Sequence, residues 1–274
     1  MDNNSTNKFR ARLKDLNIIV IKIGTSTLTY DNGKLNYPKI DKIARVVTTL
    51  SNMGKKVILV SSGAIGVGIS QLNYKIRPKT TKEKQALAAV GQCQLMNSYS
   101  KLFGEYNQTV GQILLTKDVV DNEIRKKHIT DTFETLLEMD IIPIVNENDS
   151  VSVEEIEFGD NDNLSAIVAK IVKAELLIIL SDIEGLYDKN PKVAPKAKLI
   201  KEVISITTDI EEYAMGAISS CGTGGMVTKI EAAKLATSEG IDVIITCGEN
   251  PNDILDIIEG KDIGTLFIGS KFIV

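Results

Sequence analysis

Small polar residues and glycines directly follow several short apolar runs, and their types and spacing suit the binding of phosphate. These sequences are Gly24-Thr25-Ser26, Ser61-Ser62-Gly63-Ala64, Asn146-Glu147-Asn148-Asp149 and Ser181-Asp182. Glycines let backbone N–H groups come close to a phosphate, which needs several such donors. Because ligands of open parallel sheets bind beyond the carboxyl ends of the strands, we expect the four segments to converge.

Two further segments combine glycine with charge. They are Gly159-Asp160-Asn161-Asp162-Asn163 and Gly222-Thr223-Gly224-Gly225-Met226-Val227-Thr228-Lys229, and each lies at the start of a predicted helix. A helix N-terminus carries partial positive charge, to which Lys229 adds a full one, so the second segment suits an anion. Asp160 and Asp162 have a plainer explanation as helix caps, which is the commoner role of such carboxylates.

A lysine within an apolar strand is the third chemical signal. Lys22 interrupts the run Ile18-Ile19-Val20-Ile21-Lys22-Ile23. Burying its ammonium group is costly unless an anion is close by. We therefore predict that Lys22 and Lys229 bracket a transferred phosphoryl group from opposite ends of the sequence. Which of the two meets that group stays open.

The elements that must position these residues alternate between β-branched runs and amphipathic stretches. Most runs are continuously apolar, as in parallel strands that are covered on both faces. The expected strands are Ile18–Ile23, Val57–Ser61, Thr109–Leu115, Ile141–Asn146, Leu176–Ser181 and Val243–Thr246. The expected helices are Lys39–Met53, Lys82–Phe103, Val119–Met139, Asn161–Lys173 and Val227–Glu239. This alternation predicts an α/β fold.

The chain reads as one domain with two lobes over residues 16–274, preceded by a polar arm. We expect residues 1–15 to be a frayed terminus with some helix near Phe9–Leu16. Alternating apolar residues over Val151–Phe158 predict a hairpin at the rim of the sheet. The segment Gly185–Pro195, rich in turn residues, is a candidate lid, with a plain surface connection as the alternative.

Composition excludes several classes of function. The net charge of −4 lacks the basic excess of a nucleic-acid-binding protein. Cys93, Cys221 and Cys247 form no Cys-x-x-Cys pair, which argues against zinc and against a disulfide framework. No apolar run reaches the roughly 20 residues that span a bilayer, and no secretory signal is visible. We expect a cytoplasmic protein that binds neither nucleic acid nor membrane, and we assign no metal-ligating side chains.

Motifs of three common enzyme classes are missing or incomplete. No Gly-x-x-x-x-Gly-Lys-Ser/Thr sequence exists, which argues against a P-loop kinase. Gly66-Val67-Gly68 begins a dinucleotide fingerprint, but Gln71 stands where its third glycine belongs. His128, the single histidine, lies in a charged helix, so a Ser-His-Asp hydrolase is disfavoured. Phosphoryl transfer fits best, because it needs positioning, a metal and positive charge more than a general base.

Six segments, taken in order, resemble the amino acid kinase family over Ile18–Ile268. They are Lys22-Ile23-Gly24-Thr25-Ser26, Ser61-Ser62-Gly63-Ala64-Ile65, Ala88-Ala89-Val90-Gly91-Gln92, Val145-Asn146-Glu147-Asn148-Asp149, Gly159 to Leu164 and Gly222 to Lys229. Each is weak alone, and their order makes the match specific. The resemblance implies a three-layer αβα sandwich around a central, mostly parallel β-sheet. It is closest to the members that phosphorylate the side-chain carboxylate of glutamate for proline biosynthesis.

The resemblance also implies a role for each residue, with ATP and Mg²⁺ as cofactors. Lys22, Lys229 and Asp162 would be the catalytic group, in which Asp162 keeps the lysines oriented. The glutamate site would consist of Ser62, Asp149 and Asn161, with Asn146 as a helper. Asp149 suits the ammonium group of the substrate. The nucleotide site would comprise Lys22, Gly24, Thr25, Ser26, Ser181, Asp182, Thr223, Gly224, Gly225, Met226, Val227, Thr228 and Lys229.

The implied reaction is in-line attack of the glutamate γ-carboxylate on the γ-phosphorus of Mg-ATP. The carboxylate is ionised at neutral pH, so no general base is needed. Family members also imply a homo-oligomer, feedback inhibition by proline, and handover of the acyl phosphate to the next enzyme of the proline pathway. Many carry an extra C-terminal domain, of which this chain shows no sign before Val274.

Two alternatives remain open from the sequence. A sister kinase would act on N-acetylglutamate, aspartate, carbamate or a nucleoside monophosphate, although an anionic Asp149 would not help to bind an acetylated amine. A non-catalytic sensor would bind an amino acid and a nucleotide without turnover, although the retention of both Lys22 and Lys229 argues against it.

Overall fold

A mostly parallel β-sheet forms the centre of the molecule. The computed structural model describes residues 8–74, 78–116, 118–151, 161–191, 193–216 and 225–272. The strands are β1 (Ile18–Ile23), β2 (Lys56–Ser61), β3 (Val110–Leu115), β4 (Ile142–Glu147), β5 (Leu176–Ser181), β6 (Glu202–Val203), β7 (Asp242–Cys247) and β8 (Thr265–Phe267).

The strand order places β1 in the middle of the sheet. It runs β3-β4-β2-β1-β5-β7-β8-β6, and the pairs are parallel except for the antiparallel pair of β7 and β8. All the strands that the sequence predicts are present. The sequence does not predict β6 and β8, because segments of two and three residues are too short to show an alternation.

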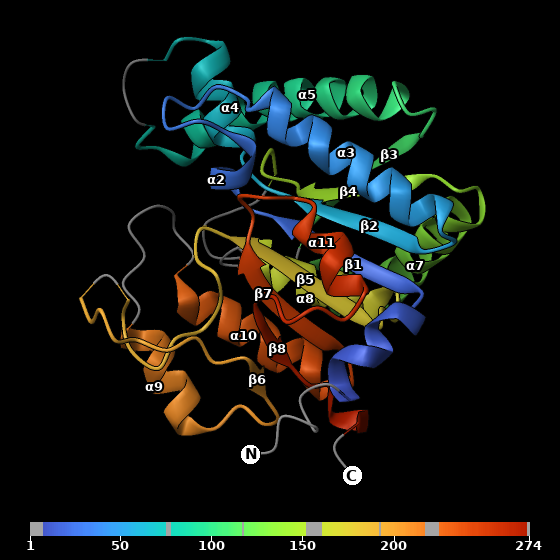
Figure 1. The fold of residues 1–274 in the computed structure, drawn as a ribbon. Coiled ribbons are helices and arrows are strands. Elements are labelled where there is room, and N and C mark those ends of the chain that lie inside the picture. The colour runs from blue at the N-terminus through green and yellow to red at the C-terminus, as the bar shows by residue number, and fades with distance from the viewer. Residues whose placement is uncertain are drawn as a thin grey trace.

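Helices cover both faces of the sheet (Figure 1). One face carries α3 (Tyr37–Asn52), α5 (Thr81–Gly104) and α11 (Asp253–Ile258), and the other α7 (Glu123–Glu138), α8 (Asn161–Ile171) and α10 (Met226–Ser238). Shorter elements are η1 (Arg12–Asp15), α2 (Thr25–Leu28), α4 (Ala64–Gln71), α6 (Asp118–Asp121), α9 (Thr208–Gly216) and η2 (Ser270–Phe272). The expected three-layer αβα sandwich is confirmed.

The sequence does not predict the helices α2, α9 and α11, and two other helical segments also differ from the prediction. The predicted helix Val119–Met139 is divided into α6 and α7, because Asn122 caps α7 with its side chain. The helix α4 is not predicted, since Gly66 and Gly68 are poor helix formers. A Cβ on Gly68 would lie 2.0 Å from the carbonyl oxygen of Leu87 in α5. Close packing on α5 therefore requires this glycine, and tertiary contact overrides its low propensity.

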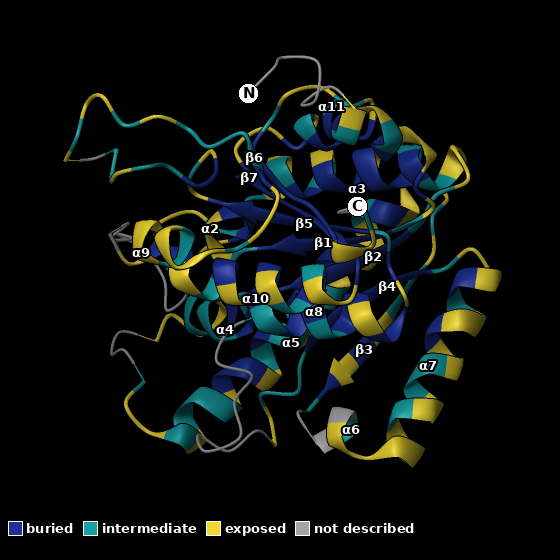
Figure 2. Ribbon diagram, turned by 90° about the horizontal axis from the view of Figure 1, so that it is seen from below, coloured by how far each residue is buried: buried dark blue, intermediate teal, exposed yellow. Residues whose placement is uncertain are grey.

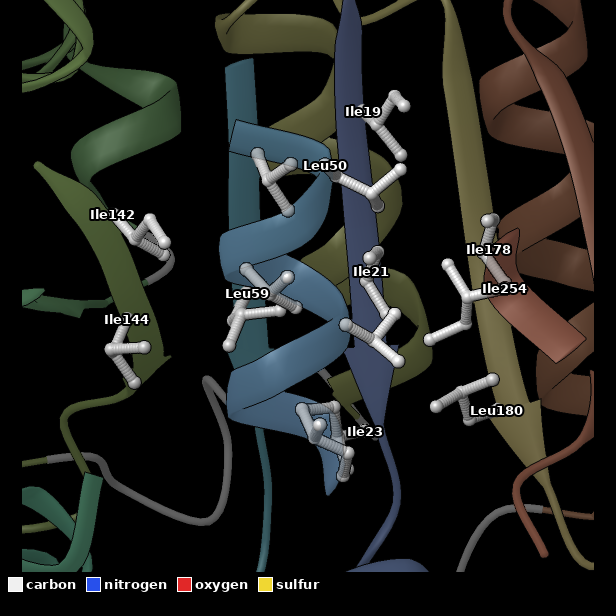
Figure 3. Packing of buried hydrophobic residues seen from close by; sticks show 14 of the residues in the cluster. Ile19, Ile21, Ile23, Leu50, Leu59, Ile142, Ile144, Ile178, Leu180 and Ile254 are labelled. Carbon is white, nitrogen blue, oxygen red and sulfur yellow. The ribbon is translucent and has the colours of Figure 1, made fainter. Parts of the chain in front are cut away.

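Alternation along the strands divides the core into two clusters. In β1, Ile21 belongs to the cluster beneath α3, α5 and α11, whereas Val20 belongs to the cluster beneath α7, α8 and α10. Figure 3 shows the first cluster, with Leu50 of α3 and Ile254 of α11 packed over side chains of the central strands. Because successive strand residues point to opposite faces, Lys22 points with Val20 toward α8 and α10.

The described part of the N-terminal arm is packed rather than frayed. Residues 8–11 are helical and continue into η1. Leu13 is fully buried, and Arg10 is 2% exposed. The guanidinium of Arg10 donates hydrogen bonds to the carbonyl groups of Lys201, Lys261, Ile263 and Gly264. The expectation of a frayed terminus is wrong for residues 10–13. The sequence around Arg10 gives no sign of its burial, because the carbonyl groups that accept its hydrogen bonds lie 191 or more residues further along the chain.

The candidate lid lies outside helices and strands, and its base is held by one side chain. The hydroxyl of Thr265 accepts a hydrogen bond from the N–H of Leu186 and donates one to the carbonyl of Ile200. Within the lid segment, residue 192 is not among the described residues. The predicted hairpin over Val151–Phe158 also lies outside the described residues, apart from Val151 in a turn.

Burial follows the layers: the strands are largely buried and the helices expose their outer faces (Figure 2). His128 is exposed on α7, as predicted. Cys93 and Cys247 are free thiols, and Cys221 lies outside the described residues. Among the described helices, none is long and apolar enough to cross a membrane.

Candidate functional site

Lys22 lies near the carboxyl end of the central strand β1 and turns toward α8. Its side chain is 6% exposed, and its Nζ lies 2.7 Å from Oδ1 of Asp162, the second residue of α8. This carboxylate is the anionic partner that a buried lysine requires.

Asp162 joins Lys22 to Lys229, and the three residues form what we call the lysine–aspartate cluster. Lys229 Nζ lies 3.0 Å from Oδ2 of the fully buried Asp162, and Thr228 Oγ1 donates to the same oxygen at 3.0 Å. Burial alone would raise the pKa of Asp162, but Lys22 and Lys229 more than offset this and hold it at about 2. With one carboxylate between two ammonium groups, the cluster attracts a further anion.

Three helices of the site begin with a glycine at the N-cap. These glycines are Gly24 before α2, Gly63 before α4 and Gly225 before α10, and no cap of the three has a side-chain hydrogen bond. The first N–H groups of a helix have no acceptor inside the helix. Glycine caps leave these donors to a ligand, whereas α3, α5 and α7 are capped by the side chains of Asn36, Thr80 and Asn122.

The starts of α2 and α4 lie close to each other and to the lysine–aspartate cluster. A Cβ on Gly24 would lie 3.7 Å from Nζ of Lys22. Gly63 has a φ of +92°, and a Cβ there would lie 3.4 Å from Cγ2 of Thr25. Gly63 thus adopts a backbone conformation that favours glycine and brings α4 against α2. The positive ends of both helices are therefore directed at the same small region.

Asn161, Asn146 and Ser62 form a second group, which we call the amide cluster. The Nδ2 group of Asn161, the first residue of α8, donates to Ser62 Oγ at 3.0 Å and to Asn146 Oδ1 at 3.0 Å. The same group donates to the carbonyl oxygen of Ser61 at 2.9 Å. Because Asn161 and Asp162 are consecutive in α8, the two clusters adjoin. Hydroxyl and amide groups can both donate to a carboxylate, so the amide cluster suits an acid.

The other predicted site residues lie in neighbouring strand-end segments. Asp149 lies in the turn after β4. Ser181 ends β5, and its hydroxyl donates to Asp182 Oδ1 at 3.2 Å. Since Leu180 pairs with Ile23 of β1, Ser181 and Asp182 follow beside Gly24. Thr223 and Gly224, in the glycine-rich segment before α10, lie outside the described residues. Gly225 is the N-cap of α10, which begins with the buried Met226 and the exposed Val227.

Gln92 of α5 is a polar contact of the amide cluster to which the sequence assigns no role. Nδ2 of Asn146 donates to Oε1 of Gln92 at 2.9 Å. The preceding Gly91 makes this possible, because a Cβ there would lie 1.8 Å from the carbonyl oxygen of Ala64. The sequence signal is the Gly91-Gln92 pair, but the acceptor and its partner meet only through the packing of α5 on α4.

The donors at this edge of the sheet suit a nucleotide that brings its own metal ion. The described residues contain no group of three or more His, Cys, Asp or Glu side chains that could hold a metal. In phosphoryl-transfer sites Mg²⁺ keeps several waters and binds largely through the substrate phosphates. Lysines and backbone N–H groups bind phosphate oxygens, so these residues fit a magnesium nucleotide held by its phosphates.

Comparison with known proteins gives a consistent picture. The family model described as "Amino acid kinase family" matches residues 17–247 of this chain. Over 266 residues the chain is 58% identical to the glutamate 5-kinase of Clostridium perfringens. The alignment covers 96% of this chain and 99% of that protein. It is 53% identical over 266 residues to the glutamate 5-kinase of Listeria monocytogenes strain EGD-e, covering 96% of either chain.

Solved structures of lower sequence identity share the fold. The chain is similar to UMP kinase from Ureaplasma parvum, with a TM-score of 0.64, 15% identity, and coverage of 92% of this chain and 99% of that one. It is similar to carbamate kinase from Giardia lamblia bound to AMP-PNP, with a TM-score of 0.65, 17% identity, and coverage of 93% and 99%. Identities this low speak for the fold alone.

Proposed function

The chain belongs to the amino acid kinase family, and on that premise we propose that it transfers the γ-phosphoryl group of ATP to the side-chain carboxylate of free L-glutamate. The product would be L-glutamyl 5-phosphate, the first intermediate of proline biosynthesis. The observation that carries the proposal is the lysine–aspartate cluster beside the amide cluster on consecutive residues of α8.

Positive charge is the main requirement of this reaction. Both the glutamate carboxylate and the phosphate chain are anionic, so their approach is opposed by repulsion. In the proposal, Lys22 and Lys229 hold the phosphoryl group between them, and Asp162 fixes both ammonium groups in place. Mg²⁺ bound to ATP would neutralise further charge on the phosphates. The attacking carboxylate is already ionised at neutral pH, so no side chain has to accept a proton.

The amide cluster is the proposed binding site of the acceptor. Asn161 and Ser62, with Asn146 beside them, would orient the substrate next to Lys22. Asp149, in the turn after β4, would bind the ammonium group of free glutamate through a charge-assisted hydrogen bond. An acetylated amine lacks that positive charge, which favours glutamate over N-acetylglutamate. The identities of 53% and 58% to glutamate 5-kinases support the same choice.

The nucleotide is proposed to lie along the segments that begin α2 and α10. Gly24, Thr25 and Ser26 and the residues from Thr223 to Lys229, namely Thr223, Gly224, Gly225, Met226, Val227, Thr228 and Lys229, would bind its phosphates together with Lys22. Ser181, which ends β5 beside Gly24, and the next residue Asp182 would bind the rest of the nucleotide. ATP with Mg²⁺ is the cofactor pair that the kinase family implies.

An acyl-phosphate trap tests the proposal. The purified protein is incubated with Mg-ATP, hydroxylamine and one acid at a time, because hydroxylamine converts an acyl phosphate to a hydroxamate, which forms a coloured complex with ferric iron. We expect hydroxamate with glutamate and none with N-acetylglutamate, aspartate or carbamate. Turnover with one of the other acids alone would contradict the proposal in favour of a sister kinase. Nucleotide binding without turnover of any acid would favour a non-catalytic sensor.

The remaining partners are proposals that rest on the resemblance. They are feedback inhibition by proline, assembly into a homo-oligomer, and handover of the acyl phosphate to the next enzyme of the proline pathway. A cytoplasmic location is a further proposal, which rests on the composition of the sequence. The division into an arm of residues 1–15 and one kinase domain of residues 16–274 remains a prediction too, as does closure of the segment Gly185–Pro195 over the site. An acyl phosphate is destroyed by water, which gives closure a chemical purpose.

A further inference from the structure

The helix α5 touches the acceptor side of the site through two side chains on one of its faces. Gln92 and Tyr99 are separated by seven residues, or about two turns, so they lie in one row along the helix. Gln92 meets Asn146 at the end of β4, and Tyr99 meets Ser61 at the end of β2. Tyr99 is the inner of the two, and neither the proposed reaction nor the resemblance gives it a role.

Tyr99 is a fully buried tyrosine whose hydroxyl group meets the side chain of Ser61. The side chain is 1% exposed and belongs to the core cluster of α3, α5 and α11. Its hydroxyl lies 3.0 Å from Oγ of Ser61. Burial raises the pKa of Tyr99 far above its ordinary value, although the Ser61 hydrogen bond opposes this. The phenol therefore stays protonated and neutral, and a buried tyrosine hydroxyl needs such a partner.

Ser61 connects α5 on one side of the sheet with α8 on the other. Strand alternation places Leu59 in the cluster beneath α5, so Ser61, two residues later, faces α5 as well. Its carbonyl oxygen accepts the hydrogen bond from Nδ2 of Asn161, the group that also binds Ser62 and Asn146. A shift of the β2 end would therefore move the three acceptors of Asn161 relative to one another.

We propose that Tyr99 is a positioning residue of the acceptor site, which acts through Ser61 to fix the amide cluster. The inference rests on the proposed function, since it assumes that the amide cluster binds the acceptor acid. Tyr99 does not touch the substrate. Its hydroxyl holds the end of β2 in the register that Asn161 needs, so its loss weakens the binding of the acid and spares the nucleotide.

The test compares two tyrosines that differ in what their hydroxyl groups hold. Tyr99→Phe removes the bond to Ser61. The control Tyr106→Phe removes a bond of 3.1 Å to Oδ1 of Asp41, which ties the residue just after α5 to α3. We expect Tyr99→Phe to raise the KM for glutamate about two- to tenfold, the range of one neutral hydrogen bond, with the KM for ATP unchanged. Tyr106→Phe changes neither KM.

A double-mutant cycle with Ser61→Ala separates positioning from a general loss of stability. If Tyr99 acts through Ser61, the double variant raises the KM for glutamate no further than the more affected single variant. Thermal unfolding of all variants shows whether the effect on KM follows the melting temperature. A KM that rises only in proportion to lost stability would overturn the proposal.

Two further outcomes overturn the inference while leaving the proposed function intact. They are an unchanged glutamate KM in Tyr99→Phe, and equal rises in the KM for glutamate and for ATP. Failure of the proposed function is seen separately, as a wild-type protein that makes no glutamyl hydroxamate. In that case the same variants are compared with the acid that the hydroxamate assay identifies, or by the thermal stabilisation that glutamate produces. An absence of any difference between Tyr99→Phe and Tyr106→Phe then overturns the inference.

Discussion

Asp162 and Asp242 are both fully buried aspartates in ion pairs, yet Asp162 lies at the carboxyl ends of the strands and Asp242 at their amino ends. Asp162 stands at the carboxyl edge, between the ammonium groups of Lys22 and Lys229. Asp242 begins β7 at the amino edge, where Arg12 donates to its Oδ1 at 2.6 Å and to its Oδ2 at 3.1 Å. The N–H of Gly269 adds a bond of 2.8 Å to Oδ1. Burial and charge alone therefore do not distinguish an ion pair of a reactive site from an ion pair that only stabilises the fold.

The partners and the edge of the sheet make the difference. A guanidinium fork matches a carboxylate in two parallel bonds, so Arg12 and Asp242 satisfy each other and tie the N-terminal arm to β7. Lysine is a compact point charge, and two of them around one carboxylate leave an excess of positive charge. In parallel sheets the carboxyl edge is where ligands bind. We therefore expect changes at Asp242 to affect folding and changes around Asp162 to affect turnover.

Removal of Arg12 is the largest expected effect on stability. Arg12→Ala leaves Asp242 buried without its cation, which typically costs about 3–5 kcal/mol. We expect the free energy of unfolding in urea to fall by that amount while the folded enzyme keeps its kcat. Neutralising the orphaned carboxylate in Arg12→Ala/Asp242→Asn should restore part of the loss. A drop in kcat with unchanged stability would erase the contrast between the two aspartates.

Removal of Lys229 is the largest expected effect on turnover. Lys229→Ala takes one donor from the developing charge on the phosphoryl group, which typically costs roughly 10²- to 10³-fold in rate. We expect kcat to fall far more than the KM for glutamate rises, as measured by steady-state kinetics. Asp162 keeps Lys22 as a partner, so the loss of stability should be smaller than in Arg12→Ala. A pure KM effect would contradict the role assigned to Lys229.

The pH dependence of stability tests the charge state of Asp162. Its pKa is lowered from 3.8 to about 2. A folded-state pKa below the unfolded one stabilises the protein at pH values above about 4, and this contribution disappears as the pH falls from 4 to 2. Its size is on the order of 2 kcal/mol. Urea unfolding across this range should show an acid loss in wild type that Asp162→Asn lacks, and parallel curves would contradict it.

An exposed pair provides the smallest expected effect and a baseline for the comparison. Lys127 Nζ lies 2.6 Å from Asp131 Oδ2, one turn along α7, with the side chains 73% and 52% exposed. Water screens such pairs, so Asp131→Asn should leave the free energy of unfolding almost unchanged. The measurement is the same urea titration. If Asp131→Asn lowered the free energy of unfolding as much as Arg12→Ala does, burial could not explain why the two ion pairs differ in their contribution to stability.

Much of the sheet could be predicted, because its signals are local. The bounds of β1 and β5 are found as predicted, since six-residue runs with five apolar side chains are distinctive. Lys22 was recognisable as a site residue because a lysine in such a run needs an anion. The glycines before α2 and α10 are recognisable because a glycine beside small polar residues is a local pattern, although the helix α2 itself is not predicted.

Other features depend on contacts between distant segments. The local sequence does not indicate the helix α4, because glycines are poor helix formers. The close contact of Gly68 with Leu87 of α5 explains why glycine stands there. The local sequence predicts that Arg10 is exposed in a solvated arm. The structure buries it, because its guanidinium donates hydrogen bonds to carbonyl groups of distant segments. Gln92 and Tyr99 look like ordinary residues of a long helix. Their partners Asn146 and Ser61 are set by the packing of α5 on the sheet, which no local pattern encodes.

The sequence by itself determined the family, the order of the longer strands and of the main covering helices along the chain, and the residue types at the strand ends. The family follows from the resemblance of six ordered segments. The order of elements and the residue types at the strand ends follow from periodicity, backbone propensity and the cost of burying charge, all of which act over a few residues. The resemblance implies that Asp162 orients the two lysines, but only the tertiary structure sets the contacts of Asp162 with Lys22 and Lys229 and the contact of Asp242 with Arg12 at the opposite ends of the strands. The physical reason is strand alternation and helix packing, which direct each side chain to one face of the sheet and bring distant charges within reach of one another.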